Sequence, residues 1–584
     1  MKKLGWCVAG LSVLVLAVGC GGSTSGQSSG DGGSAGSSGN GGSGNGGSGN
    51  GGSGNGGAGG TSGSGGSGGA PLGYSSQLDL LFVVDNSAGT NVHHERLAES
   101  VGDLIRRLQN PDCVAADGSR STPSDPAAAC PSGSERVHAP VLDLNVGVIT
   151  SSLGAAGSQY CQGQDDQAHL LPTLRDSLPG ASADGVYELR QGGDVAGLIG
   201  NVQAAIRSTG QSGCGFEMPL EAMFRFLSDP APYAELGRVA CNPSDTSKSC
   251  VELQGTDDVL LAQRKAFLRP GSTVAVVMVG DENDCSVQAG GQFWFALEPD
   301  IFPARPTKTC ESDPNSPCCY SCAQGQVNNC PAKDAECGAA PANDQVNLRC
   351  WDQKRRTGID FLHHVERYVA GLREKTIADE FDSGDTFSNA LFADGTRSPS
   401  QVHFLTLGGA PPGYLTETGA DGSVRYLDNA ALSGAGLWPE LIGDPSAYAP
   451  PQDPFMVESD APRTQVSSLS GVAPASMNAV NGGDSINAGY RLQYACIEPL
   501  QTPLECPFGD FCMCDDPEGN AACSPGGLQI AAPAYPTLRQ FAVAKDSGGE
   551  IASLCEYGAT PGRVDSGFGA SFELLQHALK PSLR

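Results

Sequence analysis

Two apolar runs in this chain are long, almost uninterrupted and end on acidic residues. Residues 78–85 read LDLLFVVD, and residues 273–284 read TVAVVMVGDEND. A strand that is apolar on both sides is buried on both faces, which is typical of a parallel sheet with helices above and below it. The helices that such a sheet needs are therefore the next feature to find in the sequence.

Helical patterns alternate with strand patterns along the chain. Further strands are predicted at 142–152, 402–409 and 550–556. Apolar residues recur at helical spacing in the segments between them. The predicted helices are residues 97–108, 195–206, 219–229, 257–268, 360–374, 537–549 and 569–580. This alternation predicts an α/β fold with a mostly parallel sheet. Ligands of such folds gather at the carboxyl ends of strands, so the loops at Asp85 and Asp281 are the first candidates for a site.

The first 19 residues have the pattern of a secretory signal. Two lysines precede an apolar run of 16 residues, which is shorter than the roughly 20 residues that a membrane-spanning helix needs. The segment LAVGC resembles the lipobox of bacterial lipoproteins, although Ala17 departs from the usual Leu. The resemblance implies a lipoprotein signal at 1–19 and a lipid on Cys20; ordinary secretion with cleavage nearby is the alternative. Gly21, where an Asp would favour inner-membrane retention, favours the outer membrane of a Gram-negative cell.

The segment that follows Cys20 is almost wholly Gly, Ser and Asn, and it contains the repeat GNGGSGNGGSGNGG. Such a composition has no side chains to bury and cannot offset the entropy lost on ordering. We therefore expect residues 20–72 to be a lipidated, disordered tether. The tether would hold the folded part, residues 73–584, away from a membrane surface.

Cysteine usage and charge both limit the class of protein. Of the 22 Cys, 20 remain once Cys7 and Cys20 are set aside, and an even number in an exported chain favours disulfides. Acidic residues outnumber basic ones by 64 to 35 without a basic patch, so nucleic acid is not an expected partner.

Two stretches cannot build a large apolar core. Residues 285–350 are rich in Cys, Pro and Asn, and residues 411–535 are rich in Gly, Pro and Ala. We expect them to be insertions stapled by disulfides. The segment CYSC at 319–322 has the spacing of a redox motif, but its Cys-rich surroundings favour structural disulfides.

Three segments in order carry a resemblance to a known family. They read VVDNSAGT at 83–90, GCGFEMPLEA at 213–222 and VGDENDCS at 279–286. They resemble the von Willebrand factor type A domain, and in particular lipid-anchored type A proteins of Gram-negative bacteria, which typically carry VVDNSGSM, GCGFEQPLEA and VTDEDDCS. The resemblance covers most of residues 78–584. It implies a doubly wound, Rossmann-like sheet with a metal-ion-dependent adhesion site at its top.

The resemblance also implies a ligand set, which this chain matches only in part. Asp85 and Ser87 match the first two positions of the family motif, and Asp281 matches the late acid that often contacts the ion through water. Carboxylates and hydroxyls suit Mg²⁺, with Mn²⁺ or Ca²⁺ as alternatives. The third position is Gly89, which has no side-chain oxygen; Thr90 could replace it only if the loop shifts.

The middle loop lacks the family's Thr, and either Ser212 or Glu217 is the candidate substitute, with Glu217 preferred. Glu282 and Asp284 are expected to be solvated loop acids. If no ion binds, Asp85 caps a helix or satisfies loop amides instead. Cys161 and Cys214 lie in loops near the top of the predicted sheet, and we expect them to be bonded to each other.

These features predict a lipid-anchored, extracytoplasmic module that binds an unknown protein, with a divalent cation at a degenerate adhesion site. The alternative is a metal-free structural protein of the envelope whose Cys-rich insertions make the contacts. An enzyme is not expected, because no pairing of a nucleophile with a base is visible.

Overall fold

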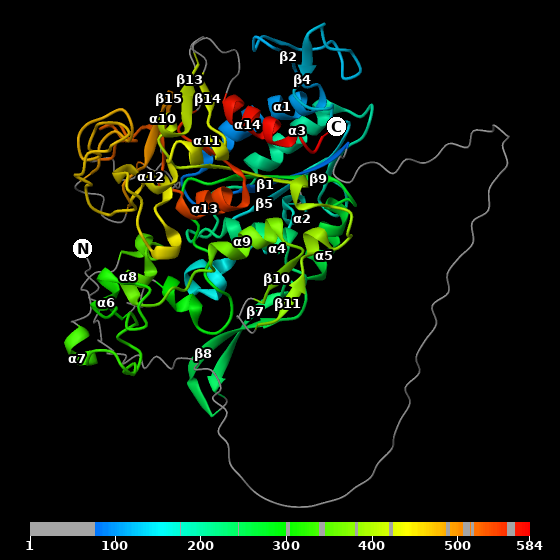
Figure 1. Cartoon of the computed structure of the whole chain (residues 1–584). Helices are drawn as coiled ribbons and strands as arrows, with labels where there is room; N and C mark the ends of the chain where they lie inside the picture. Colours follow the sequence, from blue (N-terminus) through cyan, green and yellow to red (C-terminus); the bar gives the residue numbers. More distant parts are fainter. Residues whose placement is uncertain are drawn as a thin grey trace, which may run out of the picture. The chain divides into compact units, whose positions relative to one another are not determined.

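A six-stranded sheet forms the centre of the computed structural model (Figure 1). Five strands are parallel, and the edge strand β6 runs antiparallel to β5. The order across the sheet is β17 (Glu550–Ser553), β12 (Val402–Gly408), β9 (Thr273–Val279), β1 (Gln77–Val84), β5 (Asp143–Thr150) and β6 (Tyr187–Leu189). The chain adds β5 and β6 on one side of β1 and then returns to add β9, β12 and β17 on the other, which is a doubly wound topology.

The structure describes most of the chain beyond the predicted tether. The predicted signal, Cys20 and the tether lie outside the described residues, as do Cys506 and Cys512. Residues from Leu72 onward fall into one unit. The described residues are 76–175, 177–242, 244–298, 304–337, 345–379, 384–419, 424–485, 491–505, 514, 519–556 and 567–583.

Helices cover both faces of the sheet (Figure 1). One face carries α1 (Asn91–Gln109), α3 (Val195–Arg207) and α14 (Gly569–Leu579). The other carries α4 (Pro219–Leu227), α5 (Asp258–Phe267), α9 (Val365–Arg373) and α13 (Leu538–Ser547), with the short α2 (Leu171–Leu174) beside β5. Among the described residues, no helix has both the length and the apolar character needed to cross a membrane.

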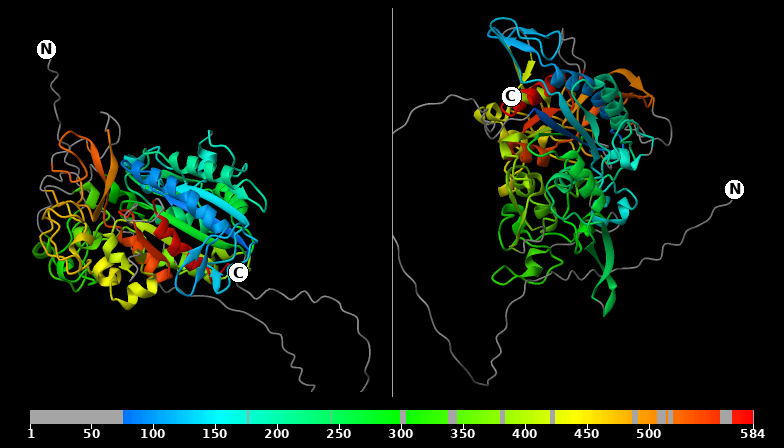
Figure 2. Two further views of the ribbon diagram at one scale, coloured as in Figure 1. Left: turned by 90° about the horizontal axis from the view of Figure 1, so that it is seen from above. Right: turned by 90° about the vertical axis from the view of Figure 1, so that its right-hand side faces the viewer.

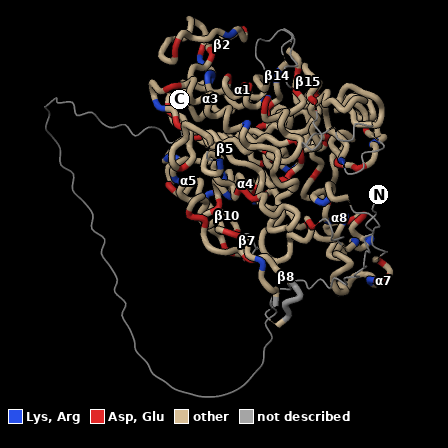
Figure 3. Tube along the Cα trace, turned by 180° about the vertical axis from the view of Figure 1, so that it is seen from behind, with Lys and Arg blue, Asp and Glu red and all other residues tan. Residues whose placement is uncertain are grey.

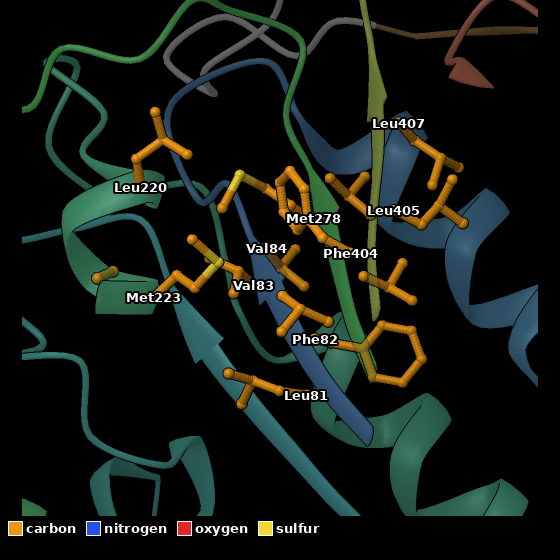
Figure 4. Close-up of a cluster of buried hydrophobic side chains, with 14 of the residues drawn as sticks. Leu81, Phe82, Val83, Val84, Leu220, Met223, Met278, Phe404, Leu405 and Leu407 are labelled. Carbon is orange, nitrogen blue, oxygen red and sulfur yellow. The ribbon is translucent and has the colours of Figure 1, made fainter. Parts of the chain in front are cut away.

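The apolar runs predicted as strands are buried as that prediction requires. Every residue of β1 from Leu78 to Val84 is buried, and so is every residue of β9. Figure 4 shows Val83 of β1 on the side of Met223 of α4, whereas Phe82, the residue before it, points to the opposite face of the sheet. The fold class predicted from sequence, an α/β chain with a doubly wound and mostly parallel sheet, is therefore confirmed.

Most predicted helices are present close to the expected bounds. The helix predicted at 537–549 ends at Ser547, where Gly548 takes a left-handed φ of 66°. The helix predicted at 360–374 was wrong in its first turn, because Leu362 bridges Val287 in extended conformation and α9 begins only at Val365. The short edge strand β6 was not predicted.

The remaining elements are short and belong mainly to loops and insertions. A hairpin of β7 (Glu235–Asn242) and β8 (Asp245–Gln254) extends away from the sheet (Figures 1 and 2), and it was not predicted. The first insertion holds α6 (Thr309–Ser312) and α7 (Lys333–Glu336), and α8 (Gln353–Thr357) follows it. The second holds α10 (Pro412–Leu415), β13 (Thr416–Thr418), β14 (Val424–Tyr426), α11 (Asn429–Gly434), α12 (Trp438–Ile442), β15 (Cys496–Leu504) and β16 (Gln529–Ala534). Small sheets elsewhere are formed by β2 (Cys113–Ala115), β3 (Arg120–Ser121) and β4 (Ser134–Arg136), and by β10 (Thr376–Ala378) and β11 (Thr386–Ser388).

Disulfides hold the insertions, as their composition predicted. Cys285–Cys350 joins the two ends of the first insertion, and Cys496–Cys555 ties β15 to the residues after β17. The predicted Cys161–Cys214 bond is present. The two Cys of the CYSC segment bond to other partners, Cys310 and Cys337, so the segment is structural, as predicted. The other disulfides of the described residues are Cys113–Cys130, Cys241–Cys250, Cys318–Cys330 and Cys514–Cys523.

The buried His138 makes the fold sensitive to acid. Burial, with help from the nearby positive charges of His577 and Arg136, lowers the pKa of His138 from 6.5 to about 4. Between these values the unfolded chain binds a proton that the folded chain does not, so stability falls as the pH falls. We expect His138→Gln to reduce that loss by up to about 3 kcal/mol between pH 7 and 4, measured by urea unfolding. His364→Gln, at an exposed position, is the control. An equal loss of unfolding free energy between pH 7 and 4 in the wild-type protein and both variants would contradict this prediction.

Candidate functional site

Asp85 and Asp281 meet where the winding of the sheet reverses. Asp85 directly follows β1, and Asp281 comes two residues after the neighbouring strand β9. The amide of Asp85 donates to the carbonyl of Val279 at 2.9 Å, which holds the two strand ends together. Burial raises the pKa of the Asp281 carboxyl, and the charge of Asp85 adds to the rise, so the two acids interact. This is the crevice in which doubly wound sheets bind ligands, and the sequence located both acids correctly.

Hydroxyl and amide groups surround the Asp85 carboxylate. Its Oδ1 accepts the amide of Ser87 at 2.8 Å and the hydroxyl of Ser151 at 3.3 Å. Asp85 is only 3% exposed, and burial raises its pKa, while the bonds from Ser87 and Ser151 oppose the rise. Ser151 was not predicted as a site residue. The signal for it was the hydroxyl run ITSS at the end of the strand predicted at 142–152.

Two glutamates join this pair of aspartates. Burial raises the pKa of Glu217 well above its usual value, and the charges of Glu282 and Asp85 add to the rise. Burial and Asp85 together raise the pKa of Glu282 to about 8. Of the two candidates in the middle loop, Glu217 is buried, whereas Ser212 is exposed. We call Asp85, Glu217, Asp281 and Glu282 the acidic cluster.

Asp281 is the least satisfied member of the cluster. It is 4% exposed, and its Oδ1 has no hydrogen-bond partner among the described residues. Burial raises its pKa well above the usual value, and Asp85 and Glu282 add to the rise. Nε2 of His93 lies 4.0 Å from Oδ2, but burial lowers the pKa of His93 to about 3, so this imidazole brings no positive charge at neutral pH. The cluster holds several carboxyl groups in little water and lacks a compensating cation from the described side chains nearest to it.

The loop after β1 has a glycine at the third position of the predicted motif, and its backbone there is left-handed. Gly89 has a φ of +96°, a left-handed conformation that a Ser at this position would rarely adopt. The hydroxyl of Thr90 donates to the carbonyl of Ser87 at 2.8 Å, so it is already used in closing the turn. Thr90 therefore lies in the loop, but the described contacts do not bring its hydroxyl to the acidic cluster.

The prediction that Asp284 is a solvated loop acid was wrong. Asp284 is fully buried. Its carboxylate accepts the amide of Leu220 at the start of α4 and pairs with Arg539 of α13 at 3.0 Å, and these contacts compensate for the burial. It also accepts the Ser286 hydroxyl at 2.6 Å. Glu282 is only partly exposed, so it is not fully solvated either. Asp284 joins two helices on the same face of the sheet, whereas Glu282 belongs to the acidic cluster.

The middle loop is fastened to the two neighbouring strand ends. The amide of Gly213 donates to the carbonyl of Asn86 at 2.8 Å, and the amide of Cys214 donates to the hydroxyl of Ser152 at 2.9 Å. Since Cys214 is also bonded to Cys161, the loop that carries Glu217 has little freedom to move away from the cluster.

The residues fit a hard divalent cation in part. Within the described ranges, no three His, Cys, Asp or Glu side chains stand close enough together to form a ready-made metal site. The donor types are nevertheless those that Mg²⁺ prefers, and the unsatisfied, buried Oδ1 of Asp281 is the kind of atom that an ion or its water would satisfy. The missing oxygen at Gly89 leaves the set incomplete.

Comparison of the chain with protein-family models, with curated proteins and with solved structures finds no match.

Neighbouring buried acids have opposite expected effects on stability. In chelator, Asp281→Asn removes one of several mutually repelling carboxyl groups and supplies a donor toward Asp85, so we expect the free energy of unfolding to rise by roughly 1 kcal/mol. Asp284→Asn weakens the buried pair with Arg539, so we expect a loss of about 3 kcal/mol. Urea unfolding at pH 7.5 measures both. A loss in both variants would show that Asp281 is as well compensated as Asp284.

Proposed function

We propose that this chain is a lipid-anchored, extracytoplasmic binding module whose domain is of the von Willebrand factor type A kind, with a degenerate adhesion site. Three ordered motifs support the family assignment. The strand order is compatible with it, and so is β6, which is the third strand of the central sheet in chain order and runs antiparallel. The observation that carries the site is the meeting of Asp85 and Asp281 at the reversal of the sheet, with one buried oxygen unsatisfied. The partner would be a protein, recognised without catalysis.

A divalent cation, Mg²⁺ or else Mn²⁺ or Ca²⁺, would be held by Asp85 and Ser87, with Asp281 acting directly or through water. When bound, it would supply the positive charge that the acidic cluster lacks and an electrophilic position for an acidic partner group. Glu217 would take the place of the family's Thr. Acidic and basic residues are interspersed along the described trace (Figure 3), which supports a protein rather than a nucleic acid as partner.

The anchor would be a lipid on Cys20, and the Gly, Ser and Asn segment would act as the tether. Together they support a location at the outer membrane. We expect Cys20→Ser to abolish incorporation of radiolabelled palmitate, because the lipid of a bacterial lipoprotein is attached to this Cys. Cys7→Ser, within the predicted signal, is the matched control and should keep the label. Incorporation of label by the Cys20 variant would contradict the predicted anchor, whereas membrane retention without label would be due to the uncleaved apolar signal or to the folded part.

The alternative function, contact through the insertions without metal, is favoured by a pocket. It has a volume of about 710 Å³ including its open mouth, and it lies between the segment that follows the first insertion, the second insertion and α13. The segment after the first insertion contributes Trp351 and Asp360, the second insertion contributes Tyr448 and Pro451, and α13 contributes Leu538. Partner capture that survives chelation and is lost in Trp351→Ala would favour this alternative over the cation-dependent function.

Cation binding is the direct test of the proposed site. We expect Mg²⁺ or Mn²⁺ to bind by isothermal titration calorimetry, and to stabilise the fold by about 2.7 kcal/mol at a hundredfold excess over Kd. Asp85→Ala should abolish both effects, whereas Glu95→Gln, which removes an exposed charge on α1, should preserve them. Circular dichroism checks that both variants are folded. An absence of binding at millimolar concentrations in the wild-type protein would remove the cation from the proposal.

A further inference from the structure

The acidic cluster does not lie open at the surface. Asp85, Glu217 and Asp281 are each no more than 4% exposed, and the fourth member, Glu282, is only partly exposed. In the adhesion sites that the motifs resemble, an acidic side chain of the partner completes the coordination of the ion, so a partner needs a path to it.

The second insertion covers the cluster through its last described segment. The amide of Tyr535 donates to the carbonyl of Asp281 at 2.7 Å, and Nε2 of His93 lies 3.0 Å from the carbonyl oxygen of Pro533. The ring of Tyr494 packs against that of Tyr535 with centroids 5.2 Å apart. Burial raises the pKa of Tyr494 to about 12, and the charge of Asp281 adds to the rise, which agrees with the phenol lying near the cluster.

The same insertion is attached at two further points. Nδ2 of Asn283, two residues after Asp281, donates to the buried carboxyl of Glu458 at 2.5 Å. The Cys496–Cys555 disulfide fixes the base of β15 to the end of β17. The covering segment is therefore held to the sheet loops by one disulfide and by hydrogen bonds, and the bond at Glu458 holds a neighbouring part of the same insertion.

Only part of the covering segment packs on the main core. Its strands β15 and β16 pair only with each other among the described strands, and they stand apart from the central sheet (Figure 2). At its base, Ala495, Cys496 and Ala534 belong to the main core. The rest has a small cluster of its own, which consists of Leu492, Tyr494, Cys514, Ala522, Cys523, Ala531 and Tyr535. A part with its own small cluster can open locally at a lower free energy than global unfolding.

We propose that the described residues of 491–535 form a built-in cover over the acidic cluster, and that a partner reaches the cluster only when this cover opens. What the partner finds there rests on the proposed function, but the closure itself does not. Because only the open fraction of molecules binds, the apparent affinity for an external partner is reduced by that fraction. The cover thus acts as an autoinhibitory element built into the chain.

Carboxyl labelling of the full chain tests the cover without any cation. Native protein in chelator is treated with a carbodiimide and glycine ethyl ester, and the modification of Asp281 and Glu217 is compared with that of the exposed Glu95 by peptide mass spectrometry. We expect Asp281 and Glu217 to be modified at least tenfold more slowly than Glu95. Equal rates at all three acids would overturn the proposal.

Loosening the cover should expose the cluster but leave the sheet intact. Tyr494→Ala removes the ring that packs on Tyr535, and we expect the modification of Asp281 and Glu217 to rise at least fivefold. Deuterium uptake in β1 and β9 should not change. Tyr448→Ala, which removes a Tyr of the same insertion that bonds to Asp360 instead, is the matched control and should leave the labelling slow.

The paired variant Cys496→Ser with Cys555→Ser loosens the cover independently and should act like Tyr494→Ala. Unchanged carboxyl labelling of Asp281 and Glu217 in both loosened proteins would overturn the proposal. So would equal increases of deuterium uptake in the cover and in the sheet, because the segment would then unfold together with the core. Since no cation is present in these measurements, their outcome is independent of whether the site binds Mg²⁺.

Discussion

The central sheet has no face open to water, and this constraint determines where the chain can keep its polar groups. Within β1, Asp79 is a charged residue that is fully buried. Its carboxylate bonds to Arg269 and Ser272 near the amino end of the strand. At the opposite end the strands finish in Asp85, Ser151 and the loop of Asp281, where backbone and hydroxyl donors are available. The same burial that stabilises the sheet therefore concentrates polar side chains at the reversal of its winding.

Much of this arrangement could be predicted, because it follows from the spacing of apolar residues along the sequence and from the topology of parallel sheets. Continuous apolar runs identify buried parallel strands whatever surrounds them, and neighbouring parallel strands bring their carboxyl ends together, so Asp85 and Asp281 could be paired from sequence. Ser151 could not be recognised, because hydroxyl residues are common after strands and only the bond to Asp85 distinguishes this one. The β7–β8 hairpin escaped prediction because it adds no strand to the central sheet.

The sequence could not predict which of the acidic residues in the loops are buried. Asp284 and Glu282 stand two residues apart in one acidic run. Asp284 pairs with Arg539 and links two helices, whereas Glu282 adds a further carboxyl group to the acidic cluster. The difference depends on Arg539, which lies 255 positions from Asp284 and reaches it only because α13 packs beside α4 and α9. Local sequence carries no signal for a contact at that separation.

The covered cluster changes the relation between the two functional hypotheses. Burying several carboxyl groups without a counter-charge is costly, so protons or a cation must supply the missing positive charge. Under the proposed function, a cation held by Asp85 and Ser87 would reach a partner only in the opened molecule. Contact through the second insertion and the pocket beside it would not need that opening. The two proposed functions would then belong to two states of one domain.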